Sequence, residues 1–261
     1  MDLRLDGVRV MVTGASRGIG LATVRRLGAE GARVVAVSRT VTPELAATGA
    51  RTVTADLSTA DGPADAVEAA LDGWGDLDVL VNNAGGGDPA ALVRGHDADA
   101  VWLAMFELNL MAAVRTTRAA LPSLTRTRGV VVNVSSDGAR APHRSFLPYA
   151  AMKGALNVWS QGLAREAAPK GVRVNVVTPS ATRTSLLAGD NGLAAVLGRA
   201  TGTDPAEVLA AVPAQNGLLT GRLIEPAEVA TLIAYLASPL AASILGGNYV
   251  IDGGALSDHV A

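Results

Sequence analysis

Two residues that could together move a proton, Tyr149 and Lys153, stand four positions apart in the sequence. Residues at this spacing share one face of a helix, so the hydroxyl and the ammonium can lean toward one point. A free tyrosine has a pKa of roughly 10, which is too high for proton exchange near neutral pH. Because a nearby positive charge favours the phenolate, we expect Lys153 to lower the pKa of Tyr149. The pair predicts a general acid or base.

A glycine-rich segment, TGASRGIG at 13–20, follows the first predicted strand and opens a helix that extends to about Glu30. Gly14 allows a tight turn, Gly18 lets the backbone approach a pyrophosphate, and Gly20 lets the helix pack close to the sheet. The free N–H groups at the helix N-terminus would face the phosphates. The spacing, G-x-x-x-G-x-G, predicts a dinucleotide site, and the alternative is a glycine-rich turn that binds no ligand.

The end of the second predicted strand carries Ser38 and Arg39. An acidic residue there would accept hydrogen bonds from the adenosine ribose of NAD. Arg39 can instead pair with a 2′-phosphate, and Arg17 of the glycine-rich segment can join it. These residues favour NADP(H) as the cofactor. The alternatives are that Arg39 is a solvated surface charge and that the cofactor is NAD(H).

Short runs rich in β-branched residues alternate with longer segments rich in alanine and leucine. Most of the runs are continuously apolar, which is typical of strands buried on both faces. The alternation predicts one doubly wound α/β (Rossmann) domain over residues 1–261, with a mostly parallel seven-stranded sheet and helices on both faces. The predicted strands are Val8–Val12, Arg33–Val37, Arg51–Ala55, Leu77–Val81, Gly129–Val134, Val172–Thr178 and Asn248–Ile251.

Composition narrows the possible partners. The 261 residues carry a net charge of −2 and no run of like charges, which argues against nucleic acid or an anionic membrane. Cysteine is absent, so no disulfide or thiolate site is possible. The three histidines, His96, His143 and His259, show no ligand spacing, and we expect no metal site. Neither a signal peptide nor an apolar run of roughly 18 residues is found, so we expect a cytoplasmic protein.

Taken together, the motifs resemble the short-chain dehydrogenase/reductase family. The resemblance is carried by the segment 13–20, NNAG at 82–85, Asn109, VNVSS at 132–136 and the Tyr149/Lys153 pair, and it extends to IDGG at 251–254. Order and spacing agree across nearly the whole chain. The resemblance implies a nicotinamide-dependent oxidoreductase that moves a hydride between the cofactor and a carbonyl or alcohol carbon.

The resemblance also implies roles for single residues. Ser136 would hydrogen-bond the substrate oxygen, and Tyr149 would give or take its proton. Lys153 would bind the nicotinamide ribose and tune Tyr149, and Asn109 would hold a water that links Lys153 to solvent. Ser135 is the alternative site serine, although the spacing of thirteen residues to Tyr149 favours Ser136.

Further residues would line the cofactor site by the same resemblance. Asp56 and Leu57 would contact adenine, the segment 83–85 would line the groove, and residues 179–184 would border the nicotinamide. Ser180 departs from the family, which usually has glycine there, and its side chain would narrow the nicotinamide pocket. The predicted cofactor-binding set is Gly14, Ser16, Arg17, Gly18, Ile19, Gly20, Ser38, Arg39, Asp56, Leu57, Asn83, Ala84, Gly85, Tyr149, Lys153, Pro179, Thr182 and Thr184.

The longest irregular stretch, 185–221, lies between the sixth strand and a helix expected to begin at Glu225-Pro226. Its glycines permit hinge-like changes, and its leucines and valines recur near helical spacing. We expect a substrate lid of short helices with an apolar face, which would favour a substrate with hydrophobic bulk. The alternative is a static packing insertion.

The expected partners are a small carbonyl or alcohol substrate and further copies of the chain. The resemblance suggests a subunit interface near Trp159, in a tetramer or dimer, and the alternative is a core role for Trp159. Arg126, Arg128 and Lys170 could form a patch for an acyl carrier protein, as in ketoreductases of the 3-oxoacyl-carrier-protein reductase type, or they are ordinary surface charges. An NADP(H)-dependent ketoreductase is favoured over an NAD-dependent alcohol dehydrogenase and over a catalytically silent nucleotide-binding protein.

Overall fold

The computed structural model describes residues 1–90, 98–142 and 146–256. Seven strands form one sheet in the order β3-β2-β1-β4-β5-β6-β7, and every neighbouring pair is parallel. The predicted Rossmann fold is therefore confirmed, with a sheet that is entirely parallel. The strands are β1 (Arg9–Thr13), β2 (Arg33–Ser38), β3 (Arg51–Thr54), β4 (Val79–Asn82), β5 (Val130–Val134), β6 (Arg173–Pro179) and β7 (Asn248–Ile251).

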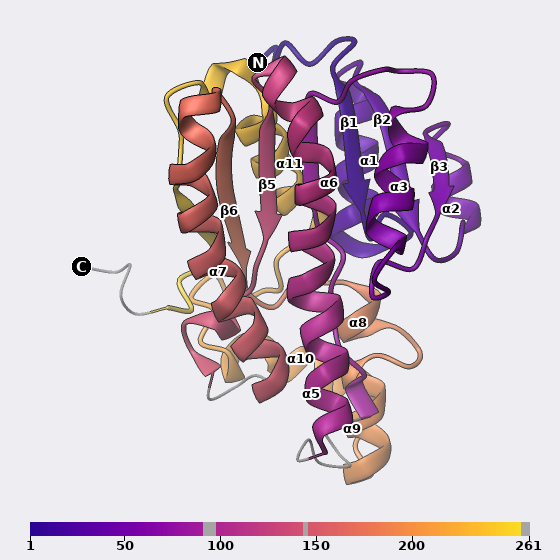
Figure 1. The fold of residues 1–261 in the computed structure, drawn as a ribbon. Coiled ribbons are helices and arrows are strands. Elements are labelled where there is room, and N and C mark those ends of the chain that lie inside the picture. The colour runs from indigo at the N-terminus through magenta and orange to yellow at the C-terminus, as the bar shows by residue number, and fades with distance from the viewer. Residues whose placement is uncertain (91–97, 143–145, 257–261) are drawn as a thin grey trace.

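Helices cover both faces of the sheet (Figure 1). One face is covered by α1 (Gly18–Ala29) and α11 (Pro226–Ala237). The other is covered by α3 (Gly62–Leu71), α6 (Ala112–Thr127) and α7 (Leu147–Ala167). Elsewhere in the described residues, the α-helices are α2 (Pro43–Ala46), α5 (Asp99–Phe106), α8 (Ser185–Ala188), α9 (Leu193–Thr201) and α10 (Pro205–Gln215). The shorter helical turns are η1 (Glu107–Met111), η2 (Asp137–Ala139), η4 (Ala168–Lys170) and η5 (Pro239–Ala241). In the described part of the chain, every helix is too short or too polar to span a bilayer.

Two apolar layers, one on each face of the sheet, explain the uninterrupted apolar runs. Along β1, Val10 and Val12 join the cluster that contains Ile233 of α11, whereas Met11 joins the cluster that contains Leu124 of α6. All five of these side chains are fully buried. Because successive side chains of a strand point to opposite faces, a strand between two helical layers needs apolar residues at every position.

The sheet order places a topological switch point between β1 and β4. From β1 the chain continues to β2 and β3 on one side, and it then returns to β4 on the other side. Connections on the two sides leave the carboxyl ends of these strands in opposite directions and open a crevice there. The glycine-rich segment, the NNAG segment and the end of β5 all reach this edge, which is the lower edge of the sheet in Figure 1.

The segment 185–221 is ordered into α8, α9 and α10, which lie beyond the carboxyl edge of the sheet (Figure 1). A parallel bridge between Thr182 and Ile224 joins the chain just before the segment to the chain just after it. Near the far end, the Thr220 N–H donates to the Gly253 carbonyl. Both ends of the segment are therefore fixed at the carboxyl edge of the sheet.

Candidate active site

The glycine-rich segment forms a cradle at the start of α1. Gly14 and Gly18 have left-handed backbone conformations, with φ of 65° and 56°, which side chains rarely adopt. A Cβ atom on Gly20 would lie 2.2 Å from the Gly14 carbonyl oxygen, so only glycine fits this crossing. Arg17 is the exposed N-cap residue of α1, and the first turn contains no acidic side chain. The N-terminal N–H groups of α1 can therefore receive an anion.

The turn after β4 is fastened to this cradle by hydrogen bonds. The N–H groups of Asn83 and Ala84 both donate to Thr13 Oγ1 at 3.0 Å. The Asn83 side-chain amide donates to the carbonyl oxygens of Thr13 and Gly14 at 2.9 and 3.1 Å. Asn83 thus holds the cradle in shape through its side chain. Thr13 is not among the predicted cofactor-binding residues, although its place directly before Gly14 indicates a role in this turn.

The adenosine end of the groove carries charges of both signs. Ser38 is buried and its hydroxyl donates to the Thr40 carbonyl, whereas Arg39 is exposed. Asp56, just beyond β3, is exposed, and hydrogen bonds from Ser58 together with the charge of Arg39 lower the pKa of its carboxyl. The end of β2 lacks a carboxylate, as the sequence indicates, but the carboxylate of Asp56 lies near Arg39, just beyond the neighbouring strand β3. The following residue, Leu57, is buried.

The residues predicted to do chemistry converge at the carboxyl ends of β4 and β5. Asn109 lies in the π-helical turn η1, where its side chain accepts from the Gly86 N–H at 2.8 Å and donates to the Gly86 carbonyl at 2.9 Å. A Cβ atom on Gly85 would lie 2.9 Å from Asn109 Oδ1 and 3.1 Å from Lys153 Nζ. Lys153 Nζ in turn lies 5.6 Å from the centroid of the Tyr149 ring. Asn109, Lys153 and Tyr149 therefore surround one small volume.

Burial sets the protonation of the pair on α7. Burial raises the pKa of Tyr149 to about 12, a hydrogen bond with Ser136 lowers it in part, and the charge of Asp137 raises it. Burial also lowers the pKa of Lys153, which is 3% exposed, to about 8. The expectation of a lowered pKa for Tyr149 is therefore wrong. Desolvation of the phenolate dominates, and Lys153 Nζ donates to the Val134 carbonyl at 2.8 Å.

Ser136 meets Tyr149 from the end of β5. Its oxygen accepts from the Gly138 N–H at 3.2 Å, and its hydroxyl donates to Asp137 Oδ1 at 3.2 Å. Ser135 is buried and its hydroxyl donates to the Lys153 carbonyl at 3.4 Å, so it points into the base of α7. The geometry places Ser136, of the two candidate serines, beside Tyr149. Asp137 was missed, although it directly follows the predicted site serine.

The chain after β6 closes the site on the side of the segment 185–221. Pro179 ends β6, and the buried Thr182 forms the bridge to Ile224. A Cβ atom on Gly18 would lie 3.1 Å from Thr184 Cγ2, and one on Gly86 would lie 3.9 Å from Leu186 Cδ2. Thr184 and α8 therefore lie directly over the glycine cradle and the turn after β4.

Other candidate features lie away from this edge. The three basic residues considered for a carrier protein stand at the amino ends of β5 and β6, where Arg126 pairs with Asp76 at 2.6 Å and Lys170 approaches Glu166 at 3.9 Å. Trp159 packs against the core cluster beneath α7, consistent with the core role. His96, His143 and His259 lie outside the described residues.

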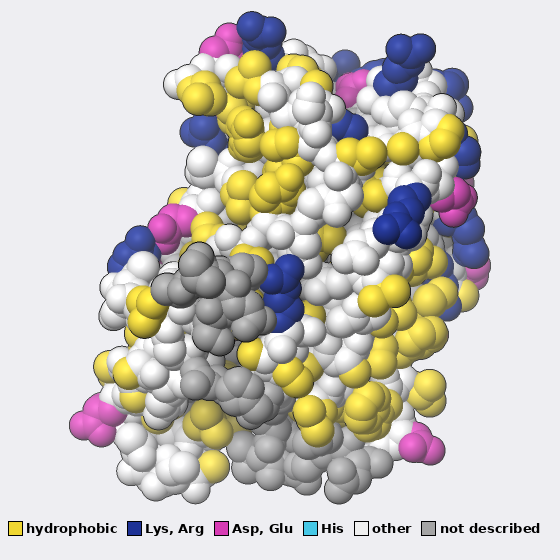
Figure 2. All heavy atoms as spheres, turned by 90° about the vertical axis from the view of Figure 1, so that its left-hand side faces the viewer, with side chains coloured by type: hydrophobic (Ala, Val, Ile, Leu, Met, Phe, Trp, Pro, Cys, Tyr) yellow, Lys and Arg dark blue, Asp and Glu magenta, His cyan; other side chains and the backbone are white. Residues whose placement is uncertain are grey.

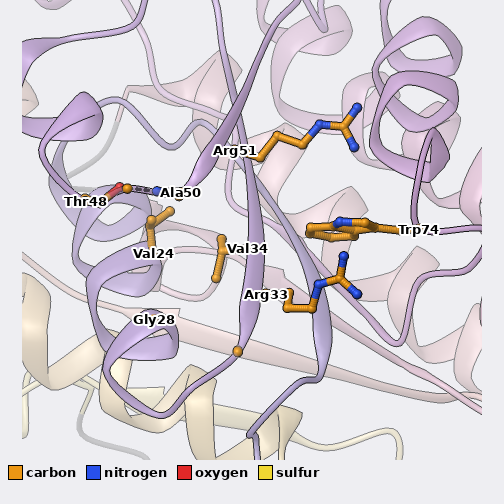
Figure 3. Close-up of a pocket in the computed structure, with 10 residues that line it drawn as sticks. Val24, Gly28, Arg33, Val34, Thr48, Ala50, Arg51 and Trp74 are labelled. Carbon is orange, nitrogen blue, oxygen red and sulfur yellow. Dashed lines mark hydrogen bonds between the residues drawn. The ribbon is translucent and has the colours of Figure 1, made fainter.

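A cavity of about 320 Å³ lies at the amino ends of β2 and β3 (Figure 3). Arg33 stacks over the Trp74 ring at 5.0 Å from its centroid, and Arg51 donates to the carbonyls of Ala69 and Asp72. Both guanidinium groups thus have protein partners. The cavity is at the opposite end of the strands from Tyr149, so it is not the catalytic site.

A dinucleotide fits the residues at the carboxyl edge. The cradle that a Cβ at Gly20 would fill leaves backbone N–H groups of α1 facing the crevice, and Gly85 leaves space between Asn109 and Lys153. The N–H groups would bind a pyrophosphate, and the space at Gly85 would let a cofactor approach Lys153 closely.

Comparison with known proteins agrees with this geometry. The family model described as short chain dehydrogenase matches residues 9–192, which cover β1 through β6, the cradle and the Tyr149/Lys153 pair. The chain belongs to the short-chain dehydrogenase family, and it is an oxidoreductase.

Several relatives are similar over nearly their full length. L-xylulose reductase of Bos taurus is 35% identical, covering 98% of this chain and 100% of the relative. The putative ketoacyl reductase of the monensin polyketide synthase from Streptomyces virginiae is 36% identical, covering 94% and 95%. The crystal structure of L-sorbose reductase from Gluconobacter frateurii, complexed with NADPH and L-sorbose, superimposes with a TM-score of 0.88 at 31% identity, covering 98% of this chain and 99% of that one.

Proposed function

We propose that the chain is an NADP(H)-dependent ketoreductase that reduces a ketone to a secondary alcohol, with Tyr149 as its acid/base. The observation that carries the proposal is the position of Tyr149 beside the buried Lys153, with Ser136 at the adjoining end of β5 and the glycine cradle at the same edge of the sheet. The relatives are named as reductases of ketoses or ketoacyl groups, and both groups contain a ketone.

The side chains have separate tasks in this reaction. When bound, NADPH supplies the hydride. Ser136 and Tyr149 hold the carbonyl oxygen, and Tyr149 gives its proton to that oxygen as the alcohol forms. A pKa of about 12 keeps Tyr149 protonated at neutral pH, which suits a proton donor in the direction of reduction. Lys153 would bind the cofactor ribose and bring positive charge near the phenolate that Tyr149 becomes. Asn109 orders the turn at Gly86 and would hold the water that links Lys153 to solvent.

The preference for NADP(H) rests on Arg39, directly after β2, and Arg17, the N-cap residue of α1, which are both exposed. A 2′-phosphate would compete with Asp56 for the Arg39 guanidinium. Because the phosphate is doubly charged, it would pair with the guanidinium more strongly than the carboxylate does. The L-sorbose reductase structure is complexed with NADPH, which supports the same choice.

Replacing Arg39 with aspartate tests this preference. Loss of the charge-assisted contact should weaken NADPH roughly 10- to 100-fold, because such a contact contributes about 1.5–3 kcal/mol. The new carboxylate should accept a ribose hydroxyl and improve NADH. Steady-state kcat/KM for both cofactors is the measurement, and Arg25→Asp on the outside of α1 is the control. If the ratio of kcat/KM for NADPH to kcat/KM for NADH is unchanged in Arg39→Asp, Arg39 does not determine the cofactor preference.

We also infer that the segment 185–221 acts as a substrate lid. Thr184 and Leu186 lie over Gly18 and Gly86, so α8 covers the groove at its catalytic end. Residues Asp190 and Asn191 connect α8 to α9 and are exposed, and the proposal requires this connection to let the outer part of the segment move against its base at Thr182 and Ile224. Closure would exclude water from the hydride transfer.

The exposed apolar side chains of α5 and α7 favour a homo-oligomer. Leu103 is 62% exposed on α5, and Val158 is 72% exposed on α7, together with the partly exposed Leu147. Figure 2 shows apolar side chains spread over the side of the molecule that carries α7, among few acidic groups. A second copy of the chain would cover such a surface.

A further inference from the structure

Asp137 lies between two serines that come from different strands. Its Oδ1 accepts the Ser136 hydroxyl at 3.2 Å, and its Oδ2 accepts the Ser180 hydroxyl. Ser136 follows β5 and Ser180 follows β6, so the carboxylate is held at the mouth of the site. Ser180 is 6% exposed, whereas Asp137 is only partly buried and a ligand in the crevice can reach it.

The hydrogen bonds of Ser136 leave no proton of its hydroxyl available to a simple ketone. The Ser136 oxygen accepts from the Gly138 N–H, and its only hydroxyl proton is directed to Asp137. A ketone oxygen accepts hydrogen bonds and donates none, so Ser136 must turn its proton from Asp137 to the substrate. The carboxylate then loses a donor in a partly desolvated site, which is unfavourable unless another donor replaces it.

We propose that Asp137 is a substrate-binding residue that selects ketones carrying a hydroxyl on the carbon next to the carbonyl. The inference rests on the ketoreductase function proposed above. The neighbouring hydroxyl donates to Asp137 Oδ1 in place of Ser136, and the Ser136 proton turns to the carbonyl oxygen. Both the carboxylate and the carbonyl are then satisfied, because one substrate supplies the donor and the acceptor at adjacent carbons.

Two observations support the position of the carboxylate. Besides burial, the charge of Asp137 also raises the pKa of Tyr149, so Asp137 lies within electrostatic reach of the reacting hydroxyl. Ser180 fixes the second carboxylate oxygen from the opposite side, which leaves Oδ1 directed to Ser136. A glycine at position 180 would leave Asp137 without this contact. Ser180, the departure from the family pattern, thus acts on specificity through Asp137.

A matched pair of ketones tests the proposal. 1-Hydroxybutan-2-one and pentan-3-one differ only by a hydroxyl in place of a methyl group next to the carbonyl. Their kcat/KM values with NADPH are measured for the wild type, Asp137→Ala, Ser180→Gly and the control Asp65→Asn, an exposed carboxylate on α3. S-Acetoacetyl-N-acetylcysteamine, a β-keto thioester without that hydroxyl, is the third substrate.

In Asp137→Ala, we expect the hydroxyketone/ketone ratio of kcat/KM to fall about 10- to 100-fold, through a loss on the hydroxyketone without a loss on the simple ketone. Ser180→Gly, which keeps the carboxylate, should lower the ratio severalfold, and the control should leave it unchanged. Titration of the wild-type NADP⁺ complex with butane-1,2-diol and with pentan-3-ol is a second measure that does not depend on the folding of Asp137→Ala, and the diol should bind at least 10-fold more tightly.

The outcomes separate this inference from the function on which it rests. An unchanged ratio in active Asp137→Ala, an equal loss on both ketones, or equal binding of the two alcohols would overturn the role of Asp137 and leave the ketoreductase intact. Preference of the wild type for the thioester over the hydroxyketone would also overturn it. Turnover of none of the three substrates would overturn the proposed function as well.

Discussion

Replacing Lys153 with methionine should raise the free energy of unfolding at neutral pH while it removes turnover. Lys153 is 3% exposed, and burial lowers the pKa of its ammonium from 10.5 to about 8. The folded protein therefore binds this proton more weakly than the unfolded chain does. The buried charge therefore lowers the free energy of unfolding of the wild type below about pH 8. The wild type regains this stability as the pH rises from about 8 to 10.5.

The magnitude follows from the same pKa change. A fall from 10.5 to about 8 corresponds to about 3 kcal/mol at neutral pH. Methionine removes that penalty, but it also removes the hydrogen bond from Lys153 Nζ to the Val134 carbonyl, which offsets about 1 kcal/mol. The expected net gain is about 2 kcal/mol at pH 7, or roughly 4–8 °C in Tm for a chain of this size. Above pH 10.5 the gain should disappear.

Urea unfolding of the cofactor-free protein at pH 7 and pH 10.5 measures the difference. The sequence contains one other lysine, Lys170, which is a matched control because it is exposed and only approaches Glu166 at 3.9 Å. Lys170→Met should change the stability by less than about 0.5 kcal/mol at either pH. A Lys153→Met protein that is less stable than the wild type at pH 7, or whose difference is the same at both pH values, would refute the reasoning.

Two further predictions concern the cradle and the lid. Gly20→Ala would place a Cβ 2.2 Å from the Gly14 carbonyl oxygen, so it should weaken NADPH binding more than 10-fold and destabilise the fold by about 1–3 kcal/mol. Gly28→Ala on the same helix meets no atom within 4 Å and should stabilise by about 0.5–1 kcal/mol, as denaturant unfolding and cofactor fluorescence will record. In hydrogen exchange, amides of 185–221 should exchange fast in the apo protein and slowly with NADP(H) and a substrate analogue; equal protection would make the segment a scaffold.

Much of the fold could be predicted from the sequence because the strand signal is local. Seven continuous β-branched runs between amphipathic segments correspond to seven strands, and the boundaries differ by at most two residues. Leu77 shows why they differ. It was predicted to begin the fourth strand, but its N–H donates to the Ser123 hydroxyl of α6, and Asp78 pairs with Arg9, so β4 begins at Val79. Such long-range partners are not visible in a local pattern.

The candidate site could be predicted only in part, because some of its features depend on contacts between residues far apart in the sequence. Motif spacing placed Tyr149, Lys153 and Ser136, which the structure brings together. The direction of the Tyr149 pKa could not be predicted, because desolvation depends on how completely the folded chain surrounds the hydroxyl. Asp137 was overlooked because its second partner, Ser180, is 43 residues away in the sequence.

The most direct test of the central claim is the turnover of Tyr149→Phe with NADPH and a ketone that the wild type reduces. The account predicts an NADPH dissociation constant within about twofold of the wild-type value, because the hydroxyl serves proton transfer. It predicts a kcat lower by about 10²- to 10⁴-fold, the usual contribution of a positioned acid or base. A variant that binds NADPH normally and keeps more than about a tenth of the wild-type kcat, with chemistry rate-limiting, would contradict the role of Tyr149.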